Sequence, residues 1–314
     1  MYGNKRRCKV ISEDEASGIP QGEFKVIITE NNCIKKIPVG DNITAMRGDN
    51  PKIVIKAENS DNILIFDEFG KVFKLPVHKI QFCDRNSPGV DIRMMIKNLT
   101  SNINSVMCES VVKEFVNKKN KYFLTIVTHG GFIKKLDLED FLNVPPSGIF
   151  FIKLDQGDVV KDTLIVGEHS DIIVYSSAKA LRMNMSEVPH LKRSTKGNRV
   201  WTSDRKVDGI SIIKNDTTDI VVITEAGKIN RFSPAALPLS TRGKAGVNVI
   251  NLSKGDAIKA IYGLNVNDSV RIVSQNDKLL IPVKDIPEGS SISGGSKIFS
   301  TRGNSIIRCD LVRG

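Results

Sequence analysis

The side chains that most often do chemistry are present in this chain, but they form no catalytic or metal-binding pattern. The four histidines are scattered, and no Ser/His/Asp or Cys/His arrangement surrounds them. The five cysteines are odd in number and never fall within metal-ligand spacing, so we expect reduced thiols rather than disulfides or zinc ligands. Residues 294–297 lack the spacing of a phosphate-binding loop. We therefore expect no active site, no metal and no cofactor in this chain.

Chemistry of another kind is expected at loops that combine cations with glycine. Residues 192–199 read Lys-Arg-Ser-Thr-Lys-Gly-Asn-Arg, residues 241–246 read Thr-Arg-Gly-Lys-Ala-Gly, and two further cations lie near the carboxyl end. Glycine lets a backbone approach a phosphate, and flanking cations neutralise it. Such loops can hold a duplex without reading its bases. The candidate DNA contacts in these loops are Lys192, Arg193, Lys196, Arg199, Arg242, Lys244, Lys297 and Arg302.

The distribution of charge supports a polyanionic partner. The net charge is +11, and residues 1–170 account for only +2 of it, whereas residues 171–314 account for +9. Basic groups gain free energy by releasing the counterions condensed on phosphates. A lysine-rich solvated surface is the alternative explanation of the same charge.

The elements that must position these loops repeat along the chain. An apolar run rich in β-branched residues, a polar or glycine turn, and a returning basic or apolar run occur six times. The turns begin at residues 29, 67, 128, 176, 224 and 274, which gives spacings of 38, 61, 48, 48 and 50 residues. Spacings in this range are typical of a propeller built from one hairpin-rich unit per repeat, because a single unit cannot bury its own apolar face.

We therefore predict an all-β fold, a six-bladed, propeller-like disc. Each hairpin is followed by a loop and a second apolar run, which predicts about four strands for each repeat. The predicted repeats lie near residues 23–60, 61–121, 122–170, 171–218, 219–267 and 268–314, after a junction at residues 1–22. One short helix is expected around residues 110–117, as an insertion. No apolar run reaches the roughly 20 residues of a membrane span, and no secretory signal is seen.

The repeats resemble the C-terminal domain of the DNA-cleaving A subunit of bacterial type IIA topoisomerases, DNA gyrase and topoisomerase IV. In that family a repeat reads as an apolar strand, T-x-x-G-x-I/V-K/R-K/R, a loop with R-x-G-x-G, and L-x-x-G-D. Residues 127–135 and 252–256 match this pattern closely, and residues 2–7 look like the junction to the catalytic core. The cations that close the hairpin motif, Lys134, Lys135 and Arg231, complete the set of predicted DNA contacts.

The resemblance implies a six-bladed β-pinwheel that binds and bends double-stranded DNA, without sequence specificity, and presents it to the cleavage gate. The implied partners are the ATPase B subunit and the rest of the A subunit, in a cytoplasmic, nucleoid-associated enzyme. Its Mg²⁺ and ATP act outside this domain, which is not expected to cut DNA alone.

One motif departs from the family pattern. The box Q-R/K-R-G-G-K/R-G, which supports full wrapping by gyrase, is replaced here by a degenerate segment with Arg47 and Gly48, followed by an acid. This departure favours a topoisomerase IV-like or a divergent, phage-borne enzyme over a strongly wrapping gyrase. A β-propeller scaffold that binds chromosome-associated proteins is the alternative function.

Overall fold

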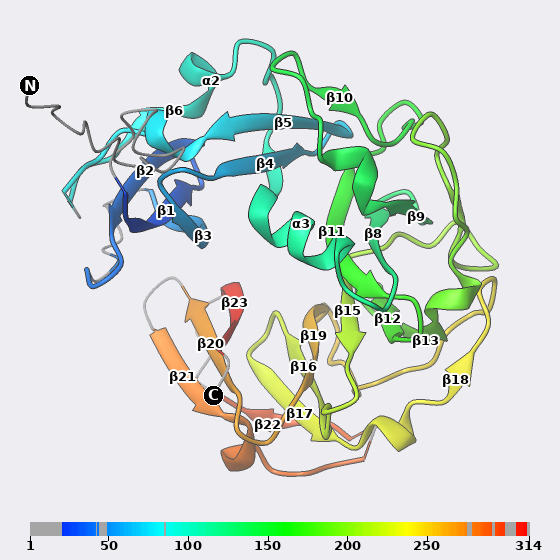
Figure 1. The fold of residues 1–314 in the computed structure, drawn as a ribbon. Helices are drawn as coiled ribbons and strands as arrows, with labels where there is room; N and C mark the ends of the chain where they lie inside the picture. Colours follow the sequence, from blue (N-terminus) through cyan, green and yellow to red (C-terminus); the bar gives the residue numbers. More distant parts are fainter. Residues whose placement is uncertain are drawn as a thin grey trace, which may run out of the picture. The chain divides into compact units, whose positions relative to one another are not determined.

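The structure is a computed structural model that describes residues 21–41, 43, 49–84, 86–274, 278–290, 293–298 and 306–312. The chain forms two compact units. The first contains the described residues up to Asp67, with Lys71–Phe115 and Glu139–Ile149. The second contains Glu68–Gly70, Val116–Leu138 and the described residues from Phe150 onward. Six small sheets make up the described part, five of four strands and one of three, as Figure 1 shows. The predicted all-β fold class is confirmed.

Each sheet is centred on an antiparallel β-hairpin, and the six hairpins are those that the repeats predict. The hairpins are β1 (Glu23–Thr29) with β2 (Cys33–Pro38), β4 (Asn62–Asp67) with β5 (Lys71–Pro76), β8 (Tyr122–Thr128) with β9 (Phe132–Asp137), β12 (Asp171–Tyr175) with β13 (Ala180–Asn184), β16 (Asp219–Thr224) with β17 (Lys228–Phe232), and β20 (Ser269–Ser274) with β21 (Lys278–Pro282). Most hairpin strands are almost entirely enclosed. This burial explains their continuous apolar runs.

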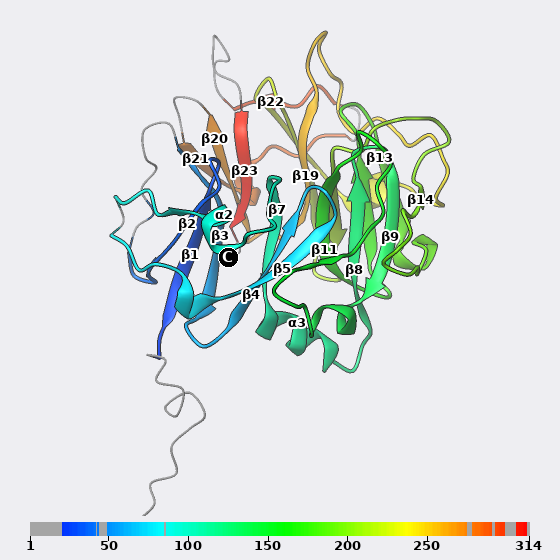
Figure 2. The same cartoon turned by 90° about the horizontal axis from the view of Figure 1, so that it is seen from above.

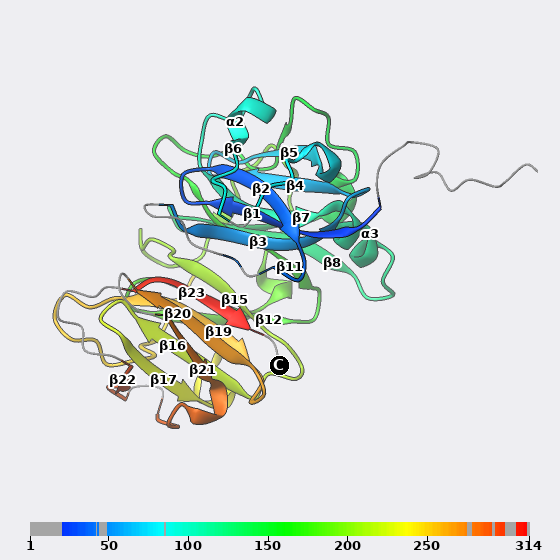
Figure 3. The ribbon, with the colours of Figure 1, turned by 90° about the vertical axis from the view of Figure 1, so that its left-hand side faces the viewer.

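A third strand pairs with the first strand of every hairpin. These strands are β3 (Pro51–Glu58), β7 (Ile103–Cys108), β11 (Val160–Gly167), β15 (Gly209–Ile213), β19 (Ile258–Leu264) and β23 (Ile306–Val312). In the second unit, β11 contacts β15, β15 contacts β19, and β19 contacts β23. Figure 3 shows the fifth and sixth sheets, in yellow to red, around these strands.

The fourth strand of a sheet comes from the segment that follows the next hairpin along the chain. It is a two-residue strand on the outer side of each of the first five sheets: β6 (Val90–Asp91) on β2, β10 (Ile149–Phe150) on β5, β14 (Asn198–Arg199) on β9, β18 (Leu239–Ser240) on β13, and β22 (Ser296–Lys297) on β17. Figure 2 shows this arrangement in the third sheet, where β11, β8, β9 and β14 lie side by side. The expectation that each repeat supplies all four strands of its own blade is therefore wrong, because the last strand joins the preceding sheet.

Helical structure is short and lies in the connections. A 3₁₀ turn follows the second strand of five hairpins, at η1 (Val77–Lys79), η2 (Leu138–Phe141), η3 (Met185–Glu187), η4 (Pro234–Ala236) and η5 (Val283–Asp285). Two α-helices, α2 (Ile92–Met95) and α3 (Glu109–Val116), occur in the described part of the chain. Helix α3 confirms the helix expected near residues 110–117.

The core of each unit lies between neighbouring sheets. In the first unit, Val26 and Ile28 of the first sheet pack with Ile63, Ile65 and Phe73 of the second. In the second unit, three such clusters join the third to sixth sheets in sequence. Each sheet thus buries both of its faces only when it has neighbours, which is the physical reason for tandem repetition.

Candidate nucleic-acid interface

The basic loops cover the outer edges of sheets that their own hairpins do not belong to. Residues 192–199 follow the fourth hairpin, yet their last two residues form β14 and pair with β9 of the third sheet. Val247, directly after the loop 241–246 of the fifth repeat, bridges Ala180 in the fourth sheet. Two loops that are 49 residues apart in the sequence thus lie over adjacent sheets.

The two loops also touch each other. The Arg242 Nη1 atom donates to the backbone oxygen of Arg199 at 3.1 Å. The Gly243 amide donates to the oxygen of Val200 at 2.7 Å, and Lys244 forms a β-bridge with Trp201. The predicted cations of both loops therefore belong to one continuous surface. We call these two segments, 192–199 and 241–246, the basic rim.

Four cations of the basic rim are exposed, Lys192, Lys196, Arg199 and Lys244, whereas Arg193 and Arg242 are half-buried. Two of the exposed cations form ion pairs: Lys196 with Asp155 at 2.8 Å and Arg199 with Asp204 at 2.6 Å. Exposed side chains of this kind are free to exchange their counter-charges with a bound phosphate.

The structure places two predicted DNA contacts in the interior instead. Lys134 is 0% exposed, and its Nζ atom donates to the backbone oxygens of Lys192, Arg193 and Thr195 at 3.1, 3.1 and 2.7 Å. Lys135 is 6% exposed and donates to the oxygen of Met185 at 2.8 Å. Neither ammonium group is available to a phosphate in this structure. We therefore remove both from the candidate interface, and assign Lys134 to holding the loop that carries Lys192.

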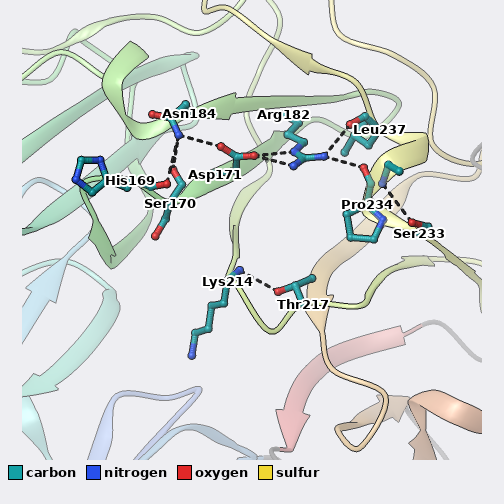
Figure 4. Close-up of polar contacts among 11 residues, drawn as sticks. His169, Ser170, Asp171, Arg182, Asn184, Lys214, Thr217, Ser233, Pro234 and Leu237 are labelled. Atoms are coloured by element: carbon teal, nitrogen blue, oxygen red, sulfur yellow. Dashed lines mark hydrogen bonds and ion pairs between the residues drawn. The ribbon is translucent and has the colours of Figure 1, made fainter. Parts of the chain in front are cut away.

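The second cation of the hairpin motif joins one sheet to the 3₁₀ turn of the next repeat. Lys135 reaches η3, and Lys36 in β2 donates to the oxygen of Val77 in η1 at 3.0 Å. Burial lowers the pKa of both lysines, because an enclosed ammonium loses hydration. Arg182 in β13 does the same at η4, where its Nη1 atom donates to the oxygens of Pro234 and Leu237 (Figure 4).

The remaining predicted contacts are placed as follows. Arg231 has only 16% of its side chain exposed and pairs with Asp219 at 3.4 Å. Lys297 is exposed in β22, directly across from Lys228 in β17. Arg302 lies outside the described residues, as do Arg47 and Gly48 of the degenerate box.

The glycines of the basic rim serve the backbone, not a phosphate as predicted. Gly197 has a φ of +94°, and a Cβ there would lie 2.6 Å from the oxygen of Ile133. At Gly246, with a φ of +70°, a Cβ would lie 2.8 Å from the oxygen of Ala180. Only glycine lets the loop lie this close to the preceding sheet.

The threonine and aspartate of the repeat motif fasten the hairpin turn. The Thr128 hydroxyl accepts from the Phe132 amide, and an oxygen of Asp158 accepts from the amides of Gly130 and Val159 at 2.6 and 2.8 Å. Asp256 repeats this arrangement in the fifth sheet. The motif by which the repeats are recognised is thus largely a folding motif.

Sequence reasoning missed several cations near the basic rim. Arg205 is half-buried and lies 5.8 Å from the Trp201 ring, and its backbone oxygen crosses the hairpin turn at Gly131. Lys206 and Lys153 are exposed, and the Lys153 amide donates to the Thr195 oxygen. They stand outside the repeated motif, so only their contribution to the positive charge of residues 171–314, in the case of Arg205 and Lys206, could have indicated them.

Other chemistry is not seen in the described part of the chain. Among those residues, no three or more His, Cys, Asp or Glu side chains gather where they could hold a metal ion. Cys33, Cys83, Cys108 and Cys309 are free thiols. None of the helices there has the length and apolar character that a membrane span requires.

Hairpin-centred sheets in tandem, each receiving an edge strand from the next repeat, define a six-bladed β-propeller of the pinwheel class. The family described as "DNA gyrase C-terminal domain, beta-propeller" matches residues 123–166, 176–200 and 218–263. Among solved structures, the C-terminal domain of DNA topoisomerase IV has a TM-score of 0.78 at 19% identity, covering 94% of each chain. The DNA gyrase A C-terminal domain has a TM-score of 0.71 at 17% identity, covering 93% of this chain and 100% of that one.

Curated relatives agree with this class. The DNA gyrase A subunit of Haloquadratum walsbyi is 23% identical over 91% of this chain and 36% of its own length. That of Metamycoplasma arthritidis is 24% identical over 97% of this chain and 36% of its own length. The chain thus spans about a third of these relatives, and its kinship with the C-terminal domains of the gyrase and topoisomerase IV A subunits is confirmed.

Proposed function

We propose that this chain is a DNA-binding domain that holds duplex DNA on the basic rim. The observation that carries the proposal is the direct contact between the two loops, through Arg242 and the Arg199 backbone oxygen. This contact joins the exposed cations of two sheets into one surface. Phosphate contacts spread over such a surface give affinity without sequence preference.

The charge of the rim supports this function. Residues 192–199 contain four cations, residues 241–246 contain two, and neither segment contains an acid. The equivalent segment of the second sheet, residues 143–150, contains no charged residue. Positive charge is thus concentrated on particular sheets of the repeat, which a generally lysine-rich surface does not explain.

The finer functional proposals rest on the resemblance to type IIA topoisomerases. The chain bends the DNA and presents it to the cleavage gate of a parent enzyme. Its partners at the nucleoid are the A-subunit core and the ATPase subunit of that enzyme, where Mg²⁺ and ATP act. Residues 1–22 form the junction, and the six repeats are the functional blades. On this proposal the purified chain neither nicks nor relaxes supercoiled plasmid.

A further proposal concerns the direction of the topological change. Residues 46–49 supply one cation and one acid, so their net attraction for phosphate is near zero. We infer that the domain bends DNA without a strong chiral wrap, as in a topoisomerase IV-like or phage-borne enzyme. Nicked circular plasmid is ligated with increasing amounts of the domain, and the linking number is read. A large progressive shift of one sign would return the chain to the gyrase type.

The test of DNA binding is a quadruple variant of the exposed rim, Lys192→Ala, Lys196→Ala, Arg199→Ala and Lys244→Ala. Its affinity for unrelated duplexes, measured by fluorescence anisotropy across a salt series, should fall. The slope of log affinity against log salt should flatten by about 0.9 for each lost phosphate contact.

The matched control changes four exposed lysines of the first unit to alanine, Lys56, Lys79, Lys97 and Lys113. It removes the same net charge and should retain most of the affinity. Equal losses in both quadruple variants would show that the rim is not the binding surface.

A protein-binding scaffold is the second candidate, favoured by exposed apolar side chains in the second sheet's outer segment. Phe150 is 63% exposed, and Pro145 and Pro146 precede it on the surface. Recognition through such a surface would depend weakly on salt. A steep salt dependence of duplex binding therefore distinguishes the two functions.

A further inference from the structure

Two cations of the basic rim meet over a single aromatic ring. The Lys196 ammonium lies 4.6 Å, and the Arg199 guanidinium 5.1 Å, from the centre of the Phe132 ring. Phe132 is 8% exposed and begins β9, where it pairs in register with Arg199. The ring is therefore a fixed surface, and β14 sets the position of Arg199 above it.

Two positive groups that share one ring repel each other unless negative charge lies beside them. In the structure that charge comes from two aspartates on different segments. Asp155 lies in the loop before β11 and pairs with Lys196 at 2.8 Å, and Asp204 lies beyond Trp201 and pairs with Arg199 at 2.6 Å. The site is thus neutral as a whole, with two cations and two carboxylates.

The carboxylates are much more accessible than internal structural partners would be. The Asp155 side chain is 53% exposed and that of Asp204 is 90% exposed, while the two cations are 45% and 49% exposed. Ion pairs this exposed to water are weak. Phosphate oxygens accept from lysine and arginine in the same way as carboxylate oxygens. A phosphate can therefore take the place of either aspartate.

We propose that Lys196 and Arg199, held over Phe132, form one phosphodiester-binding subsite, and that Asp155 and Asp204 occupy it as internal competitors when no DNA is bound. The proposal rests on the proposed DNA-binding function and deepens it. The aspartates keep the two cations extended over the ring, and they lower the affinity for DNA because binding must displace them. The subsite thereby restrains binding to duplex DNA in general.

The test is the double variant Asp155→Asn/Asp204→Asn, with affinity for a mixed-sequence duplex measured at fixed salt. Each single change should tighten binding by about two- to five-fold, the factor that corresponds to an exposed ion pair. The matched control is Asp216→Asn/Asp285→Asn, which removes two exposed acids of the same unit that form no ion pair among the described residues. The control should tighten binding much less.

A double-mutant cycle separates competition from a general gain of positive charge. In a Lys196→Ala/Arg199→Ala background the two asparagine changes should lose their effect, because the groups they release are gone. Circular dichroism verifies that every variant is folded.

Each outcome bears on one of the two proposals. If the wild-type chain shows no salt-dependent duplex binding, the proposed function fails, and this proposal fails with it. If the wild type binds but the asparagine variants match the control or bind more weakly, DNA binding stands and competition by the aspartates is refuted.

Discussion

The link that Arg182 forms between the fourth sheet and η4 should contribute strongly to stability, and Arg182→Met tests it. The guanidinium donates to the oxygens of Pro234 and Leu237 at 2.8 and 3.2 Å, and to Asp171 at 3.0 and 2.7 Å. The Arg182 and Asp171 side chains are only 19% and 17% exposed. Methionine keeps the length of the side chain but removes all four hydrogen bonds, as Figure 4 makes clear.

The expected loss is about 3 kcal/mol. A hydrogen bond to a charged group contributes about 1.5–3 kcal/mol, and removing one partner of a buried ion pair costs about 3–5 kcal/mol. The remaining contact with water, and the hydrogen bond that Asn184 still donates to Asp171, place the value at the lower end. With a denaturant dependence of about 3 kcal/mol per molar urea, the unfolding midpoint should fall by about 1 M.

The chain offers a matched control in Arg93. This arginine also pairs with an aspartate, Asp91, at 2.7 Å, but its side chain is 51% exposed. Arg93→Met should leave the urea midpoint unchanged. If both variants shift the midpoint equally, the link to η4 does not stabilise the fold and the role assigned to the second cation of the motif is wrong.

Three further predictions concern the motif and the interior. Gly197→Ala should destabilise the chain by more than the roughly 1–2 kcal/mol of a left-handed backbone, whereas Gly243→Ala, with a φ of +83° and open space around its Cβ, should show only that strain; equal thermal shifts would contradict the close approach to Ile133. Asp158→Ala should lower stability by about 1.5–3 kcal/mol, since the Gly130 and Val159 amides lose their acceptor, and an unchanged urea midpoint would refute this. Burial raises the pKa of Asp162 to about 7, so the folded state holds this proton more tightly than the unfolded state does, and the stabilisation is lost as the pH rises from about 4 through 7; Asp162→Asn should flatten this part of the curve of unfolding free energy against pH, and an unaltered curve would exclude the assignment.

The paired cations of the repeat show how a sequence pattern can be assigned to the wrong task. Lys134 and Lys135 look like phosphate ligands, because two adjacent lysines on a strand are normally solvated. In the structure both are enclosed, since backbone oxygens of a loop and a 3₁₀ turn from the next repeat surround their ammonium groups. The acceptors lie 50 to 61 residues away in the chain, so no local pattern announces them.

The sequence by itself determined the hairpins, the number of repeats and the fold class. These features are local: β-branched runs favour strands, and Thr128 with Gly131 specifies a tight turn within a few residues. Helix α3 was predictable for the same reason, from the spacing of its apolar residues. The positive charge of residues 171–314 also required no structure.

Only the tertiary structure decided which sheet each basic loop covers and which cations reach the surface. Strand β14 pairs with β9 instead of the hairpin before it, and this exchange places Arg199 beside Arg242 and over Phe132. The aspartates that neutralise Lys196 and Arg199 likewise come from separate segments. Pairing between distant segments depends on how neighbouring sheets pack, and that packing is a property of the folded repeats together, which no single stretch of sequence encodes.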